Sequence, residues 1–483
     1  MTPEPPVTPE TPASPPTLAF DGALDGMDGA TRRRLVDRRP LDEDTLRDKV
    51  RGLLLRVRRD GDQALMAMAR EFDGVDLPGL EIPRERWLHA LHTLPQGLRL
   101  ALERAVRNID TFHRAQIPAD VEVETEPGVR LGRRSTPLPA VGVYAPGGRA
   151  AYPSSVLMGV VPARAAGVPE IVVCSPPGPS GEPPAEVMAA CALAGATRLF
   201  ALGGAGAVGA MAYGTASVPR VEAIVGPGNQ WVTEAKRQVA GELRIDSPAG
   251  PSEVLVLADG EADPVRVAME LVAQAEHDPE AAVVAVTWSP ELLDRIREAL
   301  ARQVEVAPRR EVVRTALADR GALILAADRA QAMAFAREYA AEHLAIFTRD
   351  PQADLEEQTT AGTVFLGEAS TVAFGDYITG ANHVLPTSAR SRSFSGLSVL
   401  DFLRFFTWQK LSQEGARSMA EDVGLLADAE GLPGHAAAAR ARGEGSEARR
   451  DAGTGSEARR DAGAGETLPG SGADGTDTAE ETP

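Results

Sequence analysis

The chain alternates short, almost wholly apolar runs with longer segments whose apolar residues recur at helical spacing. From residue 141 onward the apolar runs are VGVY, EIVVC, RLFAL and VEAIV, and a second series follows with SEVLVLAD, AAVVAVTW, ALILAA, LAIFT and TVFLG. Continuous Val, Ile and Leu runs between helices are typical of parallel strands that helices cover on both faces. The pattern therefore predicts an α/β protein with two doubly wound, Rossmann-like parallel-sheet domains.

The regions outside these two series predict the remaining organisation. Amphipathic helices are expected over 42–70 and 84–116, and 400–440 also has a helical pattern. A Pro-rich start and a tail in which GSEARRDAG occurs twice are expected to be disordered, because neither could bury a core. The predicted parts are a disordered arm (1–16), an N-terminal helical part (17–140) packing with 250–380 as the first α/β domain, a second α/β domain (141–249), a helical C-terminal extension (381–440) and a low-complexity tail (441–483).

Composition narrows the functional class. The 483 residues carry a formal net charge of −19, which disfavours nucleic acid and anionic membrane surfaces as partners. The longest apolar stretch is interrupted by Pro, Arg and Glu, so no membrane span is predicted, and no export signal is visible. Cys174 and Cys191 lie in apolar surroundings and are expected to be core thiols in a reducing compartment. A cytoplasmic location is therefore expected.

The stretch QAEHD (274–278) ends an otherwise apolar helical pattern just before Pro279. Helix ends collect polar groups because their last carbonyls lack partners, so His277 could be only a terminal cation. The three-residue spacing also places Gln274 and His277 on one helix face, where both could reach one ion. The spacing lacks the cadence of an HExxH or CxxC zinc motif, so both readings remain open.

Two further stretches hold groups able to carry chemistry. GDYITGANHVLPT (375–387) follows a predicted strand, and Asp376 there could complete a zinc site of mixed N and O ligands, although an Asx-rich turn would look similar. In EHL, Glu342 and His343 are adjacent at a predicted helix end. They offer either a carboxylate and an imidazole for acid/base work or a solvated helix end.

Three glycine-rich loops join strands to helices: YAPGGRAAYPSS, GGAGAVGA and VGPGNQ. The second contains Gly204, Gly206 and Gly209 in the dinucleotide-binding spacing, but Glu222 starts the next strand where an acidic residue should end it. In the third, Asn229 is the expected N-cap of a helix. Three such corners in one domain favour a nucleotide site, because helix N-termini bind anions.

The motifs YAPGGRAAYPSSVLM, GPGNQWVTEAKRQV, IDSPAGPSEVLVLAD, QAEHD, EHLAIFT, GDYITGANHVLPT, SGLSVLDF and EGLPGHA, in this order, resemble the histidinol dehydrogenase family over roughly residues 25–440. The resemblance implies a four-electron oxidation of L-histidinol to L-histidine through bound L-histidinaldehyde, with two NAD+ and one Zn2+ per subunit. These are the final steps of L-histidine biosynthesis.

The resemblance also implies roles for particular residues. Glu342 would activate water, and His343 would take the alcohol proton. The implied zinc ligands are Gln274, His277, Asp376 and His435; the implied substrate contacts are these four with Ser252, His343 and Glu430; the implied NAD contacts are Tyr144, Gly206 and Asn229. The family commonly has Gln at the position of Gly206, a departure that bears on NAD affinity.

The family likeness further implies a homodimer in which the C-terminal segment completes the partner's site. Other functions stay open on the residues alone. They are a paralogue that oxidises another polar alcohol, a zinc hydrolase that uses metal-bound water, and a binding protein without catalysis. Manganese or cobalt could also occupy a site of N and O ligands.

Overall fold

The computed structural model describes residues 15–38, 44–147, 151–247 and 250–443. Contacts divide the chain into two compact units, the larger formed by 1–118 and 136–404 and the smaller by 119–135 and 405–483. Most of the predicted arm, and the predicted tail beyond 443, lie outside the described residues.

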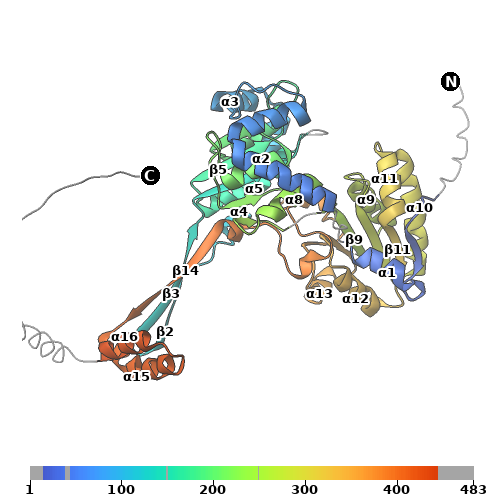
Figure 1. Ribbon diagram of the computed structural model, residues 1–483. Coiled ribbons are helices and arrows are strands. Elements are labelled where there is room, and N and C mark those ends of the chain that lie inside the picture. Colours follow the sequence, from blue (N-terminus) through green and yellow to red (C-terminus); the bar gives the residue numbers. More distant parts are fainter. Residues whose placement is uncertain (1–14, 39–43, 148–150, 248–249, 444–483) are drawn as a thin grey trace, which may run out of the picture. The chain divides into compact units, whose positions relative to one another are not determined.

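One sheet of the larger unit has five strands in the order β6-β5-β4-β7-β8, and every neighbouring pair is parallel. Its apolar runs are buried on both faces, as the sequence predicted, because helices cover both sides (Figure 1). The elements are β4 (Ala140–Tyr144), α5 (Pro153–Ala166), β5 (Glu170–Ser175), α6 (Ala185–Ala194), β6 (Arg198–Ala201), α7 (Gly204–Tyr213), β7 (Ala223–Val225), α8 (Gln230–Val239) and β8 (Arg244–Ile245).

The other sheet of this unit has six strands in the order β1-β11-β10-β9-β12-β13, again all parallel. The prediction of two doubly wound parallel sheets is therefore confirmed. The elements are β1 (Phe20–Ala23), α1 (Gly29–Val36), β9 (Glu253–Ala258), α9 (Pro264–Ala275), β10 (Ala282–Thr287), α10 (Pro290–Val306), α11 (Arg310–Arg320), β11 (Gly321–Leu325), α12 (Arg329–Tyr339), β12 (His343–Phe347), α13 (Pro351–Glu356), β13 (Thr363–Leu366) and α14 (Val372–Tyr377).

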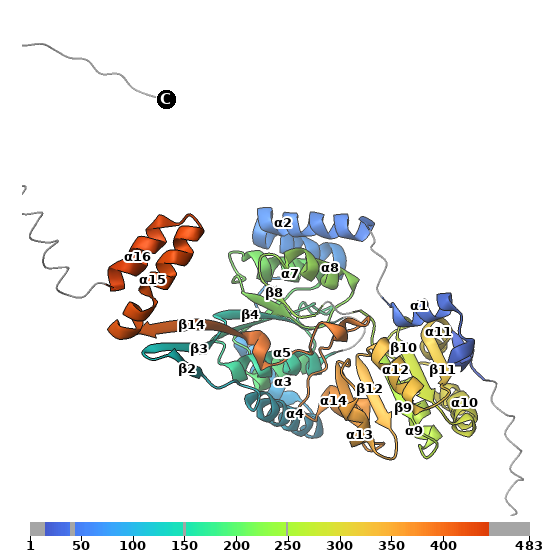
Figure 2. The ribbon, with the colours of Figure 1, turned by 90° about the horizontal axis from the view of Figure 1, so that it is seen from below.

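The N-terminal helices pack differently from the expectation that all of 17–140 joins 250–380. In this part of the chain, the segment from β1 through α1 belongs to the six-stranded domain. The other three helices pack on the five-stranded domain instead (Figure 2). Helix α2 (Asp44–Met68) contacts α7 and α8, α3 (Arg84–Thr93) contacts α6, and α4 (Gln96–Arg114) contacts α5. The apolar face of α2, with Val50, Leu54 and Val57, is buried in that domain's core, which explains the choice.

The described residues of the smaller unit form a three-stranded sheet, ordered β14-β3-β2, and two helices. The expectation of a helical C-terminal extension holds for α15 (Gln413–Ala429) and α16 (Pro433–Gly443). It fails for 381–402, which contains short 3-10 helices but no α-helix, and for 403–411, because LRFFTWQKL forms β14 (Leu403–Leu411), as its aromatic content favours. Strand β14 lies beside β3 (Val129–Pro137), which forms an antiparallel hairpin with β2 (Val121–Glu126).

Two further expectations concern single features of the chain. Both cysteines are buried and unpaired, as predicted, and burial raises the pKa of each thiol. Among the helices of the described residues, none has the length and apolar character to cross a membrane.

Candidate functional site

Glu342 and His343 lie where α12 gives way to β12. The helix ends at Tyr339, Ala340 takes the left-handed conformation (φ 51°, ψ 59°), and His343 is the first residue of the strand. The pair is therefore at the start of a strand, not at the helix end that the sequence predicted. Both residues are almost fully buried, with 5% and 3% of their surface exposed, so the alternative of a solvated helix end is wrong.

The ring of His343 has a different neighbour at each nitrogen. Nδ1 lies 2.9 Å from the backbone carbonyl of Glu253 and 3.4 Å from Oε2 of Glu342. A carbonyl oxygen can only accept, so Nδ1 carries the proton in this contact. Nε2 lies 3.4 Å from Oδ1 of Asp376 and is buried without a hydrogen-bond partner in the described part of the chain. This nitrogen is therefore available to a ligand.

Burial and mutual charge shift the pKa values of this cluster. Burial raises the pKa of the Glu342 carboxyl, and the charge of His343 limits that rise. Burial alone would lower the pKa of His343, but Glu342 and Asp376 raise it well above its ordinary value. Burial would raise the pKa of Asp376, but His343, with His383 and His277 farther off, brings it below its ordinary value. Asp376 therefore stays ionised, as a metal ligand must.

Helices α9 and α14 position the predicted metal ligands of the larger unit. Gln274 is buried in the last turn of α9, and His277 follows the helix end, so the predicted helix boundary is confirmed. Glu270, one turn before Gln274, accepts the N–H of Val372 at 3.1 Å and thereby holds the start of α14 against α9. Asp376 lies one turn farther along α14, and the charge of His277 contributes to lowering its pKa.

The donor chemistry of these residues suits a zinc ion. The described residues contain no group of three His, Cys, Asp or Glu side chains that could hold a metal. In the larger unit the predicted set provides the imidazole of His277, the carboxylate of Asp376 and the amide oxygen of Gln274. These are the N and O donors that zinc accepts. A tetrahedral zinc ion would need one more donor beside these three.

Three other predicted residues have simpler surroundings. Ser252 is half-buried directly before β9, and its carbonyl accepts the N–H of Ala282 at 3.0 Å. Glu430 is the C-cap of α15 in the smaller unit. His435 lies in the first turn of α16, where its N–H donates to the carbonyl of Leu432 at 3.0 Å. The larger unit thus brings together Glu342, His343 and Asp376, while Glu430 and His435 belong to the smaller unit.

The predicted cofactor residues lie at the carboxyl ends of strands in the five-stranded sheet. Tyr144 ends β4, and its hydroxyl accepts the N–H of Gly204 at 3.2 Å, at the first residue of α7. Burial raises the pKa of Tyr144 to about 12. Gly226 follows β7 with φ of +113°, and a Cβ there would lie 2.1 Å from the carbonyl oxygen of Tyr144. Only glycine permits this approach.

Asn229 and Gly206 have structural roles that the geometry explains. The side chain of Asn229 accepts the N–H groups of Trp231 and Val232 at 3.1 and 3.2 Å, so the predicted N-cap of α8 is confirmed. A Cβ on Gly206 would point at Met68 of α2, 3.0 Å from its sulfur. Glycine at this position therefore also serves the packing of α7 against α2.

Sequence reasoning missed three buried charged residues around the pair. Glu253, Arg38 and Glu270 are exposed by 1%, 5% and 7%. One signal was present for Glu253, because it is a carboxylate at the head of the six-residue buried run EVLVLA. A charge in that position requires a buried partner. No local pattern in DRRP or in VAMELVA identifies Arg38 or Glu270 as a buried charged residue.

Comparisons with known proteins agree with this arrangement. The family model described as histidinol dehydrogenase matches residues 36–443. The histidinol dehydrogenase of Methanothermobacter thermautotrophicus is 46% identical over 84% of this chain and 96% of its own length. That of Halobacterium salinarum is 47% identical over 86% and 97%. The crystal structure of histidinol dehydrogenase from Elizabethkingia anophelis superposes with a TM-score of 0.84 at 32% identity, covering 88% of this chain and 98% of that one. This chain therefore belongs to the histidinol dehydrogenase family.

Proposed function

We propose that this protein oxidises L-histidinol to L-histidine, with two NAD+ per substrate, as the final steps of L-histidine biosynthesis. The observation that carries the proposal is the buried cluster in which one imidazole lies 3.4 Å from each of two carboxylates, those of Glu342 and Asp376. Two oxidations in one site need a base for an alcohol and a base for water, and this cluster offers both. The names of the similar proteins support the choice of substrate.

In the first oxidation, Nε2 of His343 takes the proton of the substrate alcohol while a hydride leaves the same carbon. In the neutral form of the ring, the hydrogen bond from Nδ1 to the Glu253 carbonyl leaves the free electron pair on Nε2, which faces Asp376. Tyr144 and Asn229, at the strand ends of the five-stranded domain, would hold NAD+, which would supply the hydride acceptor. The products are the aldehyde, NADH and a proton.

In the second oxidation, Glu342 takes a proton from water as the water oxygen bonds to the aldehyde carbon. Its raised pKa makes this carboxylate a stronger base than an exposed glutamate. The hydrated aldehyde then loses a hydride to a second NAD+ and a proton to the protein, which leaves the carboxylic acid. Burial of the pair keeps the aldehyde away from bulk water during the exchange of cofactor.

Gln274, His277 and Asp376 would hold a zinc ion together with His435 of a partner subunit. The ion would act as a template for the substrate's amino and imidazole nitrogens. A cation beside Asp376 would also weaken the effect of this carboxylate on His343, which lowers the pKa of the imidazole toward a value suited to a base.

The division of these proposed ligands between two separate units of the chain supports a homodimer with a shared site. In the smaller unit, Leu425 and Leu426 of α15 and Leu432, between α15 and α16, are exposed by 58%, 68% and 42%. Large apolar side chains exposed together are typical of a surface that another chain covers. We expect this partner to be a second copy, and we expect the enzyme to work in the cytoplasm.

The test is a count of NADH formed per L-histidinol consumed by the purified protein. Two NADH per substrate, lost on chelation and restored by zinc, are expected. One NADH would contradict the second oxidation, and none would contradict the proposal. Hydrolysis of L-histidine methyl ester without NAD+ would favour the zinc hydrolase instead.

A further inference from the structure

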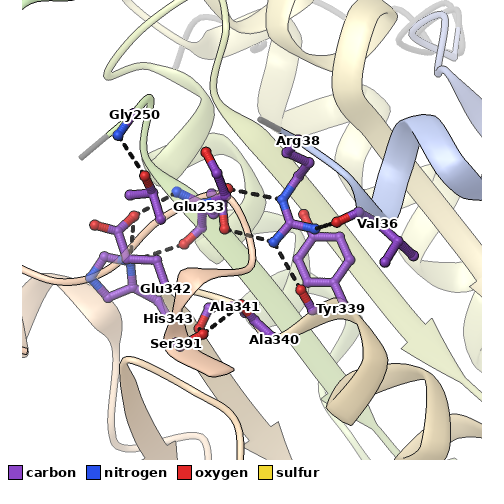
Figure 3. Close-up of polar contacts among 12 residues, drawn as sticks. Val36, Arg38, Gly250, Glu253, Tyr339, Ala340, Ala341, Glu342, His343 and Ser391 are labelled. Carbon is purple, nitrogen blue, oxygen red and sulfur yellow. Dashed lines mark hydrogen bonds and ion pairs between the residues drawn. The ribbon is translucent and has the colours of Figure 1, made fainter. Parts of the chain in front are cut away.

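The backbone of Glu253 contacts both catalytic side chains. Its N–H donates to Oε2 of Glu342 at 2.7 Å, and its carbonyl accepts the Nδ1–H of His343 at 2.9 Å (Figure 3). Strand pairing brings these groups together, because β9 and β12 are parallel neighbours with Val254 opposite His343. A single residue therefore orients the carboxylate of one catalytic group and selects the tautomer of the other.

The side chain of Glu253 is fixed as firmly as its backbone. Its two carboxylate oxygens accept Nε–H and Nη2–H of Arg38, both at 2.8 Å, in a bidentate pair. The oxygen Oε1 also accepts the N–H of Ser388 at 2.7 Å. Both side chains of the ion pair are 2% exposed. The carboxylate has no freedom to turn without leaving a buried charge unpaired.

Arg38 connects this carboxylate to the helix that precedes the catalytic pair. Its Nη1 donates to the carbonyls of Leu35 and Val36 at 2.8 and 3.1 Å, and its Nη2 donates to the carbonyl of Tyr339 at 2.9 Å. The guanidinium carbon lies 3.6 Å from the centroid of the Tyr339 ring. All five N–H donors of the guanidinium thus have an acceptor. One of these acceptors is the carbonyl of Tyr339, the last residue of α12, three positions before Glu342.

We infer that Arg38 and Glu253 are positioning residues for the reaction, acting through the Glu253 backbone on Glu342 and His343. This inference rests on the catalytic roles proposed above. A buried ion pair contributes little to stability compared with well-packed neutral side chains. Its fixed bidentate geometry, however, holds the peptide that aims two reacting groups, and small displacements of such groups slow catalysis strongly.

The test compares the full-length enzyme with Glu253→Gln and with the double variant Arg38→Met/Glu253→Gln. The first leaves the Arg38 charge unpaired, so its Tm should fall, while the second removes both charges and should recover much of that Tm. The matched control is Asp354→Asn, because Asp354 is a buried carboxylate paired with Arg329 in the same domain and contacts neither catalytic residue. The measurements are Tm, zinc content, and kcat and KM for L-histidinol.

Glu253→Gln and the double variant should both lose about ten- to a hundredfold in kcat, the range typical of groups that orient a functional histidine. KM and zinc content should stay near wild type, and Asp354→Asn should lower Tm with normal kcat. Recovery of kcat together with Tm in the double variant, or unchanged kcat in both, would overturn the inference. Should the double variant not fold, Arg38→Lys is the substitute, because lysine keeps the charge but cannot form the bidentate pair. It should show the same loss of kcat, and a normal kcat in this variant would refute the inference. An inactive wild-type enzyme would instead refute the proposed function.

Discussion

The two sheets of the larger unit present their chemistry at opposite ends of their strands. In the five-stranded sheet, Tyr144 ends β4 and Gly226 follows β7, so the glycine loops gather at carboxyl ends. In the six-stranded sheet, Glu253 and His343 are the first residues of β9 and β12, at amino ends. The proposed site residues therefore lie at strand-to-helix corners in one sheet and at helix-to-strand corners in the other.

The difference follows from the helix termini that each end contains. Carboxyl ends of strands lead into helix N-termini, such as those of α7 and α8, whose free N–H groups favour an anion like a pyrophosphate. Amino ends of strands follow helix C-termini, such as those of α9 and α12, whose free carbonyls favour cations. A metal ion and a positively charged amine suit the second setting. Variants in the six-stranded sheet should therefore change kcat or metal content, and variants in the five-stranded sheet should change KM for NAD+.

The largest effect is expected from His343→Asn. Loss of the base at Nε2 should lower kcat about a hundred- to ten-thousandfold with little change in KM for NAD+.

Glu342→Gln should spare the first hydride transfer and block the second, so a single turnover should yield one NADH. Rapid-quench measurement of NADH checks both expectations. Equal loss of both hydride transfers in Glu342→Gln would contradict the division of labour between the two side chains.

Removal of a proposed metal ligand is the next strongest test of the site at the amino ends of the six-stranded sheet. Asp376→Asn keeps the shape of the side chain but removes its negative charge, which the lowered pKa of this carboxyl favours. The variant should lose most of its zinc on gel filtration, as measured by metal analysis, and its activity should require added zinc. Tyr377→Phe, at the exposed neighbouring position, is the control. An Asp376→Asn protein that retains zinc and activity would remove Asp376 from the ligand set.

Gly226→Ala tests the loops at the carboxyl ends of the five-stranded sheet in the same way. The new Cβ would lie 2.1 Å from the carbonyl oxygen of Tyr144 at a backbone φ of +113°, so the loop after β7 must move. KM for NAD+ should rise about tenfold or more, while zinc content stays normal. Gly241→Ala is the control, because a Cβ there meets nothing within 4 Å. A normal KM for NAD+ in Gly226→Ala would break the proposed assignment of this loop to the cofactor.

The sequence predicted the strands and helix ends that local patterns determine, and it missed the contacts between residues far apart in the chain. The apolar runs placed β9 to β12 correctly, and Pro279 together with QAEHD placed the end of α9. The pair at 342–343 was found, but its placement on a strand was not, because polar residues before an apolar run also suit a helix end. The Arg38–Glu253 pair joins residues 215 positions apart, and no local pattern records such a contact. The family likeness supplied the ligand set that spacing alone left open.

Asn229 offers the smallest and most selective test, because its side chain has a structural contact and a proposed cofactor contact. The amide oxygen caps α8 through the N–H groups of Trp231 and Val232. Asn229→Ala should therefore cost about 1 kcal/mol of stability and also raise KM for NAD+. Asn229→Ser restores the cap without the amide, so it should recover the stability but keep the raised KM. Denaturant unfolding and steady-state kinetics on the two variants separate these contributions. If KM recovers together with stability in Asn229→Ser, the residue acts only by capping α8, and the cofactor contacts of this loop belong to its backbone.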